Sequence, residues 1–328
     1  MRDSVRAMRA AFISSFDADD PASVVEFGDR PEPSPPDGWV VVEVRAAALN
    51  HHDVWSARGI GLAQEQLPMI LGCDAAGVDP DGREVVVHGV VNDPAWVGHE
   101  ELDPKLALLS EGPQGALAER VAVPAGNLVP KPPELSFEEA ACLPTAWLTA
   151  YRMLFTKAEL RPGDTVLVQG ASGGLAGALI RLGTAGGLRV WVTGRDAEKR
   201  AFAERLGAHA TFESGARLPD RVDAVMDSVG APTFKHSIRS LRRGGVLVSS
   251  GGTGGYVAEV ELARLFRLNL RILGSTMGTR EELDRLVRFC VERDLRPDID
   301  AVLPLEETPA AVARMASSDV RGKIVLTP

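Results

Sequence analysis

A glycine-rich segment near the middle of the chain is the first candidate for chemistry. An apolar run at 166–168 is typical of a buried strand, the small residues 170–174 follow it, and an apolar helical pattern begins at Leu175. Backbone N–H groups at a helix start can bind a pyrophosphate when no side chain stands in the way. The segment predicts a turn that binds a dinucleotide through Ala171, Ser172, Gly173, Gly174 and Leu175.

The fingerprint of such turns, G-x-G-x-x-G/A, is met only in part. Alanine stands at the first and last glycine positions, whereas the central Gly173, where phosphates come closest, is retained. An ordinary strand-to-helix turn is the alternative interpretation. A second apolar strand is expected at 188–192, and this β-α-β context favours the dinucleotide.

The end of that second strand is expected to contact the adenosine ribose. An acidic residue about 20 positions after the glycines would accept hydrogen bonds from the 2′-hydroxyl of NAD. The chain instead places donors and positive charges there, which suit a 2′-phosphate: Thr193, Gly194, Arg195 and Lys199. Asp196 is expected to cap the next helix. The prediction is therefore NADP(H) rather than NAD(H), and the alternative is that Arg195 and Lys199 belong to a solvent-exposed helix start.

Composition is typical of a globular cytoplasmic protein. The 328 residues suffice for two domains, and 45% are hydrophobic and 25% charged. A net charge of −9 disfavours nucleic-acid binding. The sequence contains no apolar run of about 18 residues, so it predicts no membrane-spanning helix. Residues 1–9 contain arginines but no apolar stretch long enough for a secretory signal, and residues 1–7 are expected to be loosely ordered. Three widely spaced cysteines predict reduced thiols: Cys73, Cys142 and Cys290.

The chain changes character near Ser136. Before it, strand-like segments occur at 24–27, 40–44, 84–91 and 115–123. After it, helices are expected at 138–141, 149–155, 197–206 and 280–292, and strands at 221–226, 245–249, 270–274 and 322–326. The alternation from Arg161 onwards predicts a parallel sheet covered by helices on both faces, and so an α/β fold.

Several motifs together resemble the medium-chain dehydrogenase/reductase superfamily, in its zinc-independent branch of quinone oxidoreductase-like proteins. They are AAALNHHD at 46–53, LGCDAAG at 71–77, LRPGDTVLV at 160–168, DSVG at 227–230, GGVLVSSG at 244–251 and Gly322-Lys323. The resemblance implies a GroES-like, β-rich catalytic domain at 1–133 and 279–328. It implies a Rossmann domain with a doubly wound parallel sheet at 134–278, and a cofactor in the cleft between the two domains.

The same resemblance addresses zinc. Positions that hold metal ligands in zinc-dependent relatives carry Asn50, Cys73, Asp74 and Thr145 here. A stable site needs three or four converging ligands, and Asn and Thr bind zinc poorly. The four cysteines of the structural zinc lobe are also missing between Asn92 and Ser110. We therefore expect no metal, and Cys73 reads as a small core residue.

Without a metal, acceptors that spread charge themselves are favoured. Quinones and α,β-unsaturated carbonyls do so when they receive a hydride, and we expect an NADPH-dependent reductase of one of these classes. Asn50 and Thr145 are the expected hydrogen-bond donors to the acceptor oxygen, His52 the candidate acid and Asp53 a positioning residue. The alternative for His51 and His52 is that both are polar residues on a loop.

The resemblance implies further cofactor contacts, and two other functions are open as alternatives. A zinc alcohol dehydrogenase and a non-catalytic NADPH-binding redox sensor are the alternatives. A homodimer joined at the strand 270–274 is expected, with no nucleic-acid or membrane partner. The expected cofactor-binding residues outside the glycine turn and the ribose end are His51, Ser228, Gly230, Ser250, Gly251, Asn269 and Lys323.

Overall fold

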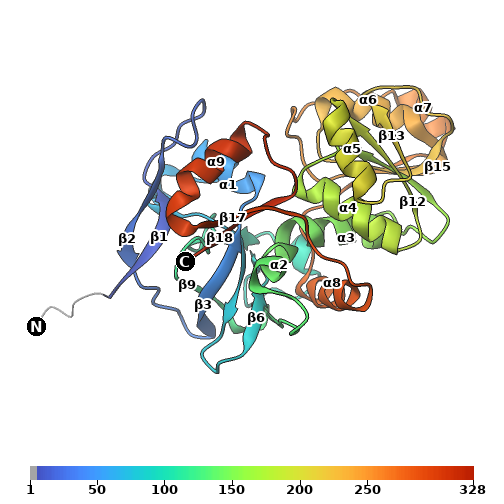
Figure 1. Cartoon of the computed structure of the whole chain (residues 1–328). Coiled ribbons are helices and arrows are strands. Elements are labelled where there is room, and N and C mark those ends of the chain that lie inside the picture. Colours follow the sequence, from blue (N-terminus) through green and yellow to red (C-terminus); the bar gives the residue numbers. More distant parts are fainter. Residues whose placement is uncertain (1–5) are drawn as a thin grey trace, which may run out of the picture. The chain divides into compact units, whose positions relative to one another are not determined.

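A computed structural model describes residues 6–328, so the expectation for residues 1–7 lies mostly outside the described part of the chain. The chain forms two compact units (Figure 1). Unit 1 runs to Thr145 and resumes with Thr279–Pro328, and unit 2 comprises Ala146–Gly278. The sequence places this boundary at 133/134 instead. The difference arises because helix α2 (Phe137–Ala141) packs on strands β3 (Trp39–Ala48) and β5 (Asp74–Val78) of unit 1.

Unit 1 is built on strands that pair antiparallel, except for the parallel pair β17–β18, around a mainly aliphatic core. Its largest sheet has the order β10-β6-β5-β3-β18-β17, with β9 also paired to β3; β2-β1-β4 and β7-β8 form smaller sheets. The other strands are β1 (Ala7–Ile13), β2 (Val25–Pro31), β4 (Met69–Ile70), β6 (Glu84–Val87), β7 (Val90–Val91), β8 (Ala107–Leu108), β9 (Arg120–Pro124), β10 (Leu128–Pro130), β17 (Ile299–Pro304) and β18 (Lys323–Thr327).

Two features of unit 1 position the candidate site. Helix α1 (His51–Ala57) begins directly after β3, so the two histidines lie on a helix and the loop interpretation is wrong. The final strand β18 pairs antiparallel with β3, with Val325 opposite Ala48. This pairing brings the last strand of unit 1 next to the strand that precedes α1. The remaining helices of unit 1 are α8 (Arg280–Glu292) and α9 (Thr308–Ala316).

Unit 2 contains a six-stranded, fully parallel sheet with the order β13-β12-β11-β14-β15-β16. The strands are β11 (Thr165–Gln169), β12 (Arg189–Gly194), β13 (Ala210–Glu213), β14 (Val222–Asp227), β15 (Leu241–Ser249) and β16 (Arg271–Gly274). Successive residues of a strand point to opposite faces, and Val166, Leu167 and Val168 are all fully buried. Both faces of the sheet are therefore covered, and the α/β prediction is confirmed.

Five helices accompany this sheet (Figure 1). They are α3 (Leu148–Tyr151), α4 (Gly174–Ala185), α5 (Ala197–Arg205), α6 (Ala231–Ser240) and α7 (Leu262–Arg267). The helix expected at 149–155 is split, because its second half, Arg152–Lys157, winds as a π-helix. Strand β16 is an outer strand of the sheet, as expected for 270–274. No helix within residues 6–328 has the length and apolar character needed to cross a membrane.

Candidate active site

Asp53 fixes the start of α1 in unit 1. Its carboxylate accepts hydrogen bonds from the backbone N–H of Asn50 and from that of Gly72, each at 2.8 Å. Gly72 has φ +95°, and a Cβ there would lie 2.7 Å from Leu117 Cγ, so only glycine fits this turn. Asp53 is fully buried, and burial raises its pKa. It therefore ties α1 to the turn before β5.

Asp74 is the centre of a buried polar cluster. Its carboxylate accepts from Asn50 Nδ2 at 2.8 Å, from Thr145 Oγ1 at 2.5 Å and from Lys323 Nζ at 3.1 Å. Lys323 Nζ also donates to Asn50 Oδ1 and to Leu49 O, both at 2.7 Å. The three ammonium protons are thus used, and the two opposite charges are held together away from water.

This cluster changes two expected roles. Asn50 and Thr145 are predicted to donate to an acceptor oxygen, but each directs a proton to Asp74 instead. Lys323 is predicted to reach the cofactor, but its side chain is 3% exposed and its ammonium is bonded inside unit 1. The physical reason is the carboxylate of Asp74, which needs hydrogen-bond donors because it is buried. The family resemblance groups Asn50, Asp74 and Thr145, but it does not reveal that Lys323 joins them or that Asp74 organises the cluster.

His52 belongs to a second polar group on the same helix. Its Nε2 lies 2.8 Å from Glu111 Oε1, and its Nδ1 lies 3.5 Å from Ser110 Oγ. Burial lowers the pKa of His52, but hydrogen bonds with Cys73 and Glu111 outweigh it and raise the pKa to about 11. The ring is therefore an imidazolium at neutral pH. Nothing in the spacing of the sequence pointed to Glu111, because it is distant along the chain.

His51 and Cys73 flank these two groups. His51 is the exposed first residue of α1, with its ring centroid 6.4 Å from that of Trp55. Cys73 is fully buried, its Sγ lies 3.4 Å from Thr145 Oγ1, and burial raises the pKa of its thiol. The three cysteines are all buried, free thiols. A protonated, buried thiol fits the interpretation of Cys73 as a core residue.

The residues at the expected zinc-ligand positions do not fit a zinc ion. Asn50, Asp74 and Thr145 are bonded to one another, and the Lys323 ammonium supplies the positive charge beside them. Zinc binding needs converging thiolate, imidazole or carboxylate ligands. Among residues 6–328 no group of three or more His, Cys, Asp or Glu side chains has a geometry that could hold a metal ion.

The glycine-rich turn of unit 2 leads from β11 into α4. Gly170 has φ +94°, and Gly173 is the N-cap of α4, with no side chain of the described residues capping the helix. Nothing in residues 6–328 beyond the chain neighbours of Gly173 lies within 4 Å of the place of a Cβ on it. The space beside Gly173 at the N-terminus of α4 is therefore open. An anion fits there.

A series of hydrogen-bonded polar side chains connects the strands next to this turn. Thr193 donates to Gln169 Oε1, and Gln169 Nε2 donates to Ser237 Oγ at 3.0 Å. Ser237 in turn donates to Asp227 at 2.6 Å. Thr193 is fully buried, so its expected contact with a 2′-phosphate is corrected: its hydroxyl points into the sheet. These hydrogen bonds link the neighbouring strands β12, β11 and β14 and fix the carboxyl edge of the sheet.

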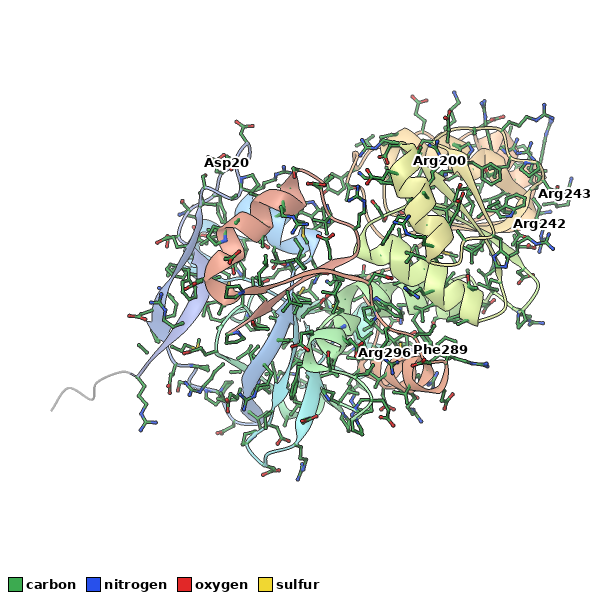
Figure 2. The ribbon with its side chains drawn as sticks, in the orientation of Figure 1. Asp20, Arg200, Arg242, Arg243, Phe289 and Arg296 are labelled. Atoms are coloured by element: carbon green, nitrogen blue, oxygen red, sulfur yellow. The ribbon has the colours of Figure 1, made fainter. Side chains whose placement is uncertain are left out.

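The expected ribose end is formed by the turn between β12 and α5. Arg195 is exposed, and Asp196 caps α5 by accepting from Lys199 N at 2.7 Å, as expected. Gly194 packs so closely that a Cβ would lie 2.9 Å from Ala171 Cβ. Arg200, labelled in Figure 2, donates to Gly194 O at 2.9 Å. It therefore shapes this turn, a role that the sequence did not reveal.

The loops after β14 and β15 complete the carboxyl edge. Asp227 Oδ1 accepts from Val229 N and from Gly230 N, which has φ +86°. A Cβ on Gly251 would lie 3.3 Å from Ser228 O, so the two loops touch. Ser250 Oγ and Ser275 Oγ are buried without a hydrogen-bond partner among residues 6–328. These hydroxyls have hydrogen-bonding capacity left for a polar ligand, and the sequence did not reveal Ser275.

Asn269 lies at the other edge of the sheet. It directly precedes Leu270 and β16, whereas the glycine-rich turn follows the end of β11. Since the strands are parallel, the start of one strand and the end of another lie at opposite edges. The cofactor role expected for Asn269 is therefore corrected. Its φ of +51° is instead a turn conformation that asparagine tolerates.

Family models match both units. Residues 36–133 match the alcohol dehydrogenase GroES-like domain, and residues 201–326 match a model described as zinc-binding dehydrogenase. The chain is 30% identical over 335 residues to the crotonyl-CoA carboxylase/reductase of Cereibacter sphaeroides, covering 84% of this chain and 77% of that protein. It is 29% identical over 317 residues to the acryloyl-coenzyme A reductase of Metallosphaera sedula, covering 90% and 94%.

Solved structures agree with these relatives. An NAD-dependent alcohol dehydrogenase matches with a TM-score of 0.89 at 35% identity, covering 98% of this chain and 100% of that one. A 2-octenoyl-CoA carboxylase reductase, CinF, solved with NADP and 2-octenoyl-CoA, matches with a TM-score of 0.89 at 28% identity, covering 98% and 87%. The chain, with its GroES-like unit 1 and Rossmann unit 2, belongs to the medium-chain dehydrogenase/reductase superfamily.

Proposed function

We propose that the chain is an NADPH-dependent oxidoreductase that reduces the carbon–carbon double bond of an α,β-unsaturated carbonyl compound without a metal. The observation that carries the proposal is the Lys323 ammonium bonded to Asn50 and Asp74 at the positions of zinc ligands in zinc-dependent relatives. Two relatives named for crotonyl-CoA and acryloyl-CoA support an enoyl thioester as the acceptor. A quinone is the other acceptor class that needs no metal.

The carboxyl edge of unit 2 fits the phosphates of the cofactor. The uncapped α4 N-terminus beyond Gly173 suits the pyrophosphate, and the exposed Arg195 suits a 2′-phosphate. The orphan hydroxyls of Ser250 and Ser275 suit the polar nicotinamide end. A relative solved with NADP supports the same choice, although an alcohol dehydrogenase described as NAD-dependent is also similar. When bound, NADPH supplies a hydride.

The residues of unit 1 suit the anion that hydride addition leaves on the substrate. A conjugated carbonyl shares that charge with its oxygen, so a positioned donor stabilises it without a Lewis acid. We assign this role to His52, whose Nδ1 makes a long contact of 3.5 Å with Ser110 Oγ while Nε2 is fixed by Glu111 at 2.8 Å. A pKa of about 11 keeps the proton on His52 until a stronger base, such as an enolate, forms.

Consumption of NADPH with a panel of acceptors tests the proposal. The panel contains crotonyl-CoA, a simple enone, a benzoquinone and, as a saturated control, butyryl-CoA. We expect turnover with the conjugated thioester and none with butyryl-CoA. Turnover with the quinone alone would reject the enone, and tight NADPH binding without turnover on any acceptor would reject the enzyme in favour of a redox sensor. Titration with NADH and NADPH tests the cofactor choice separately.

Homodimerisation through unit 2 is a further part of the proposal. Strand β16 is an outer strand, and Arg271 and Gly274 on it are exposed. An exposed edge offers unpaired backbone groups to a second copy of the same strand. Small-angle scattering and equilibrium sedimentation of the whole chain test this. A monomer at all concentrations would reject it.

A further inference from the structure

The amino edge of the parallel sheet in unit 2 is rich in arginine. Strands β11, β12, β14, β15 and β16 each have an arginine within their first residues or in the turn before them: Arg161, Arg189, Arg221, Arg242 and Arg271. The whole chain carries a net charge of −9, so this concentration of positive charge is local. It lies at the edge opposite the glycine-rich turn and takes no part in the proposed reaction.

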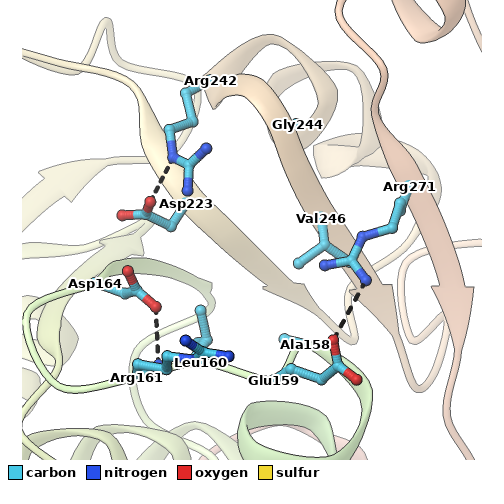
Figure 3. A pocket seen from close by; sticks show the side chains of 10 residues that line it. All are labelled: Ala158, Glu159, Leu160, Arg161, Asp164, Asp223, Arg242, Gly244, Val246 and Arg271. Carbon is cyan, nitrogen blue, oxygen red and sulfur yellow. Dashed lines mark hydrogen bonds and ion pairs between the residues drawn. The ribbon is translucent and has the colours of Figure 1, made fainter.

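Three of these arginines, Arg161, Arg242 and Arg271, line a cavity of about 270 Å³ (Figure 3). A bulge in β15 opens this cavity. Val222 pairs with Leu241 and Ala224 pairs with Val246, so residues 242–245 of β15 stand opposite the single residue Asp223. Bulges of this kind redirect side chains at sheet edges. Here the bulge carries Arg242 and Gly244, which both line the cavity.

One side of the cavity is neutralised and rigid. Arg242 Nε is bonded to Asp223 Oδ1, and Arg242 Nη1 donates to Arg243 O at 2.9 Å. Asp223 Oδ2 also accepts from Thr165 N at 2.7 Å. Both oxygens of Asp223 and the Nε and Nη1 atoms of Arg242 are therefore bonded within the protein. This pair forms a fixed wall rather than a binding group.

The other side holds two guanidinium groups with weak or no partners. Arg271 Nη1 lies 3.8 Å from Glu159 Oε2, which is too long for a hydrogen bond, and the Glu159 side chain is 72% exposed. Arg161 bonds Asp164 Oδ2 through its backbone N–H at 2.8 Å. Within residues 6–328 its guanidinium has no hydrogen-bond or ion-pair partner. Five N–H donors on each guanidinium are thus mostly unused beside a cavity.

We propose that this cavity binds a small molecule through a phosphate or carboxylate group held between Arg161 and Arg271. Planar guanidinium groups bind such oxyanions with two parallel hydrogen bonds each. Binding exchanges the loose contact of Arg271 with Glu159 for charge-assisted hydrogen bonds, and an exposed ion pair of that kind contributes little. Asp164 lines the same cavity, and its Oδ2 accepts from the backbone N–H of Arg161.

Thermal unfolding of the whole chain with inorganic phosphate or malonate, at constant ionic strength set with chloride, tests this site. We expect saturable stabilisation by at least one of the two probes, and the two arms distinguish a phosphate ligand from a carboxylate ligand. Arg161→Ala and Arg271→Ala should each weaken the apparent affinity about tenfold or more. Arg189→Ala is the matched control, because Arg189 lies on the same edge but outside the cavity.

Three outcomes would overturn the proposal. They are no saturable effect of either probe on the unaltered protein, an Arg189→Ala effect as large as that of Arg161→Ala, or unchanged affinity in both cavity variants. NADPH affinity should be the same in Arg161→Ala and in the unaltered chain, because the glycine-rich turn lies at the opposite edge. A failed NADPH titration would therefore count against the proposed function and not against this site.

Discussion

Lys323 Nζ and Asp74 Oδ2 lie 3.1 Å apart, although the two residues are 249 positions apart in the chain. Their side chains are 3% and 0% exposed. The contact arises because β18 pairs with β3, which in turn pairs with β5, where Asp74 begins the strand. A buried pair of this kind fixes the geometry of every residue bonded to it, including Asn50 and Thr145.

Removal of the ammonium should therefore be costly. Lys323→Met leaves the Asp74 carboxylate buried without its counter-charge, and we expect a loss of about 3–5 kcal/mol in the free energy of unfolding. Chemical denaturation measures it. Arg285→Ala, which breaks an exposed ion pair with Glu281 at 2.6 Å, is the control and should cost less than about 1 kcal/mol. Equal losses of unfolding free energy in the two variants would show that the buried pair contributes no more than the exposed one.

The charge on His52 should depend on Glu111. The folded-state pKa of His52 is raised from 6.5 to about 11, so its contribution to stability is complete below pH 6.5 and is lost as the pH rises through about 11. Glu111→Gln replaces the carboxylate beside the imidazolium by a neutral amide, so the pKa of His52 should fall and the loss should begin at lower pH. NMR titration of the ring measures this. Glu65→Gln, at an exposed position, should change nothing.

Because the space beside Gly173 is open, a larger side chain there should leave folding intact and weaken cofactor binding. No described residue beyond its chain neighbours lies within 4 Å of a Cβ there, so Gly173→Val should keep its melting temperature. The same side chain would occupy the place of the pyrophosphate, and NADPH affinity should fall by about tenfold or more. Fluorescence titration measures it. Unchanged affinity would place the phosphates elsewhere.

Replacement of Arg195 should change the preference between NADPH and NADH, whereas replacement of Thr193 should not. Arg195 is exposed at the end of β12, so Arg195→Ala should reduce the preference for NADPH over NADH about tenfold. Thr193→Val loses only the internal bond to Gln169, so it should lower stability and leave the preference unchanged. The ratio of the two dissociation constants measures both. A changed ratio in Thr193→Val would restore the first interpretation of that hydroxyl.

Local sequence patterns were enough to predict the parallel sheet of unit 2 and its glycine-rich turn. Apolar runs such as 166–168, followed by small residues, reveal a strand and a helix start without knowledge of distant partners. Helix α1 was missed because its start, Asn50 to Asp53, is polar, and the helix depends on the capping carboxylate of Asp53. Such a cap is a short-range signal, but it is hard to recognise in the sequence where the neighbouring residues are also polar.

Long-range contacts could not be predicted in this way. The bonds from Asp74 to Lys323 and from Glu111 to His52 depend on which strands and loops meet in space. The same is true of Asn269, whose motif match ignored the edge of the sheet on which it lies. Position along a parallel strand decides which residues can share a ligand, and that requires the topology.

The most direct test of the central claim compares activity with metal content. The protein is treated with a chelator, its zinc is measured by elemental analysis, and NADPH oxidation with crotonyl-CoA is followed on the same sample. Full activity in protein that contains far less than one zinc per chain is the predicted result. Activity that disappears with the metal and returns in proportion to added zinc would contradict the account.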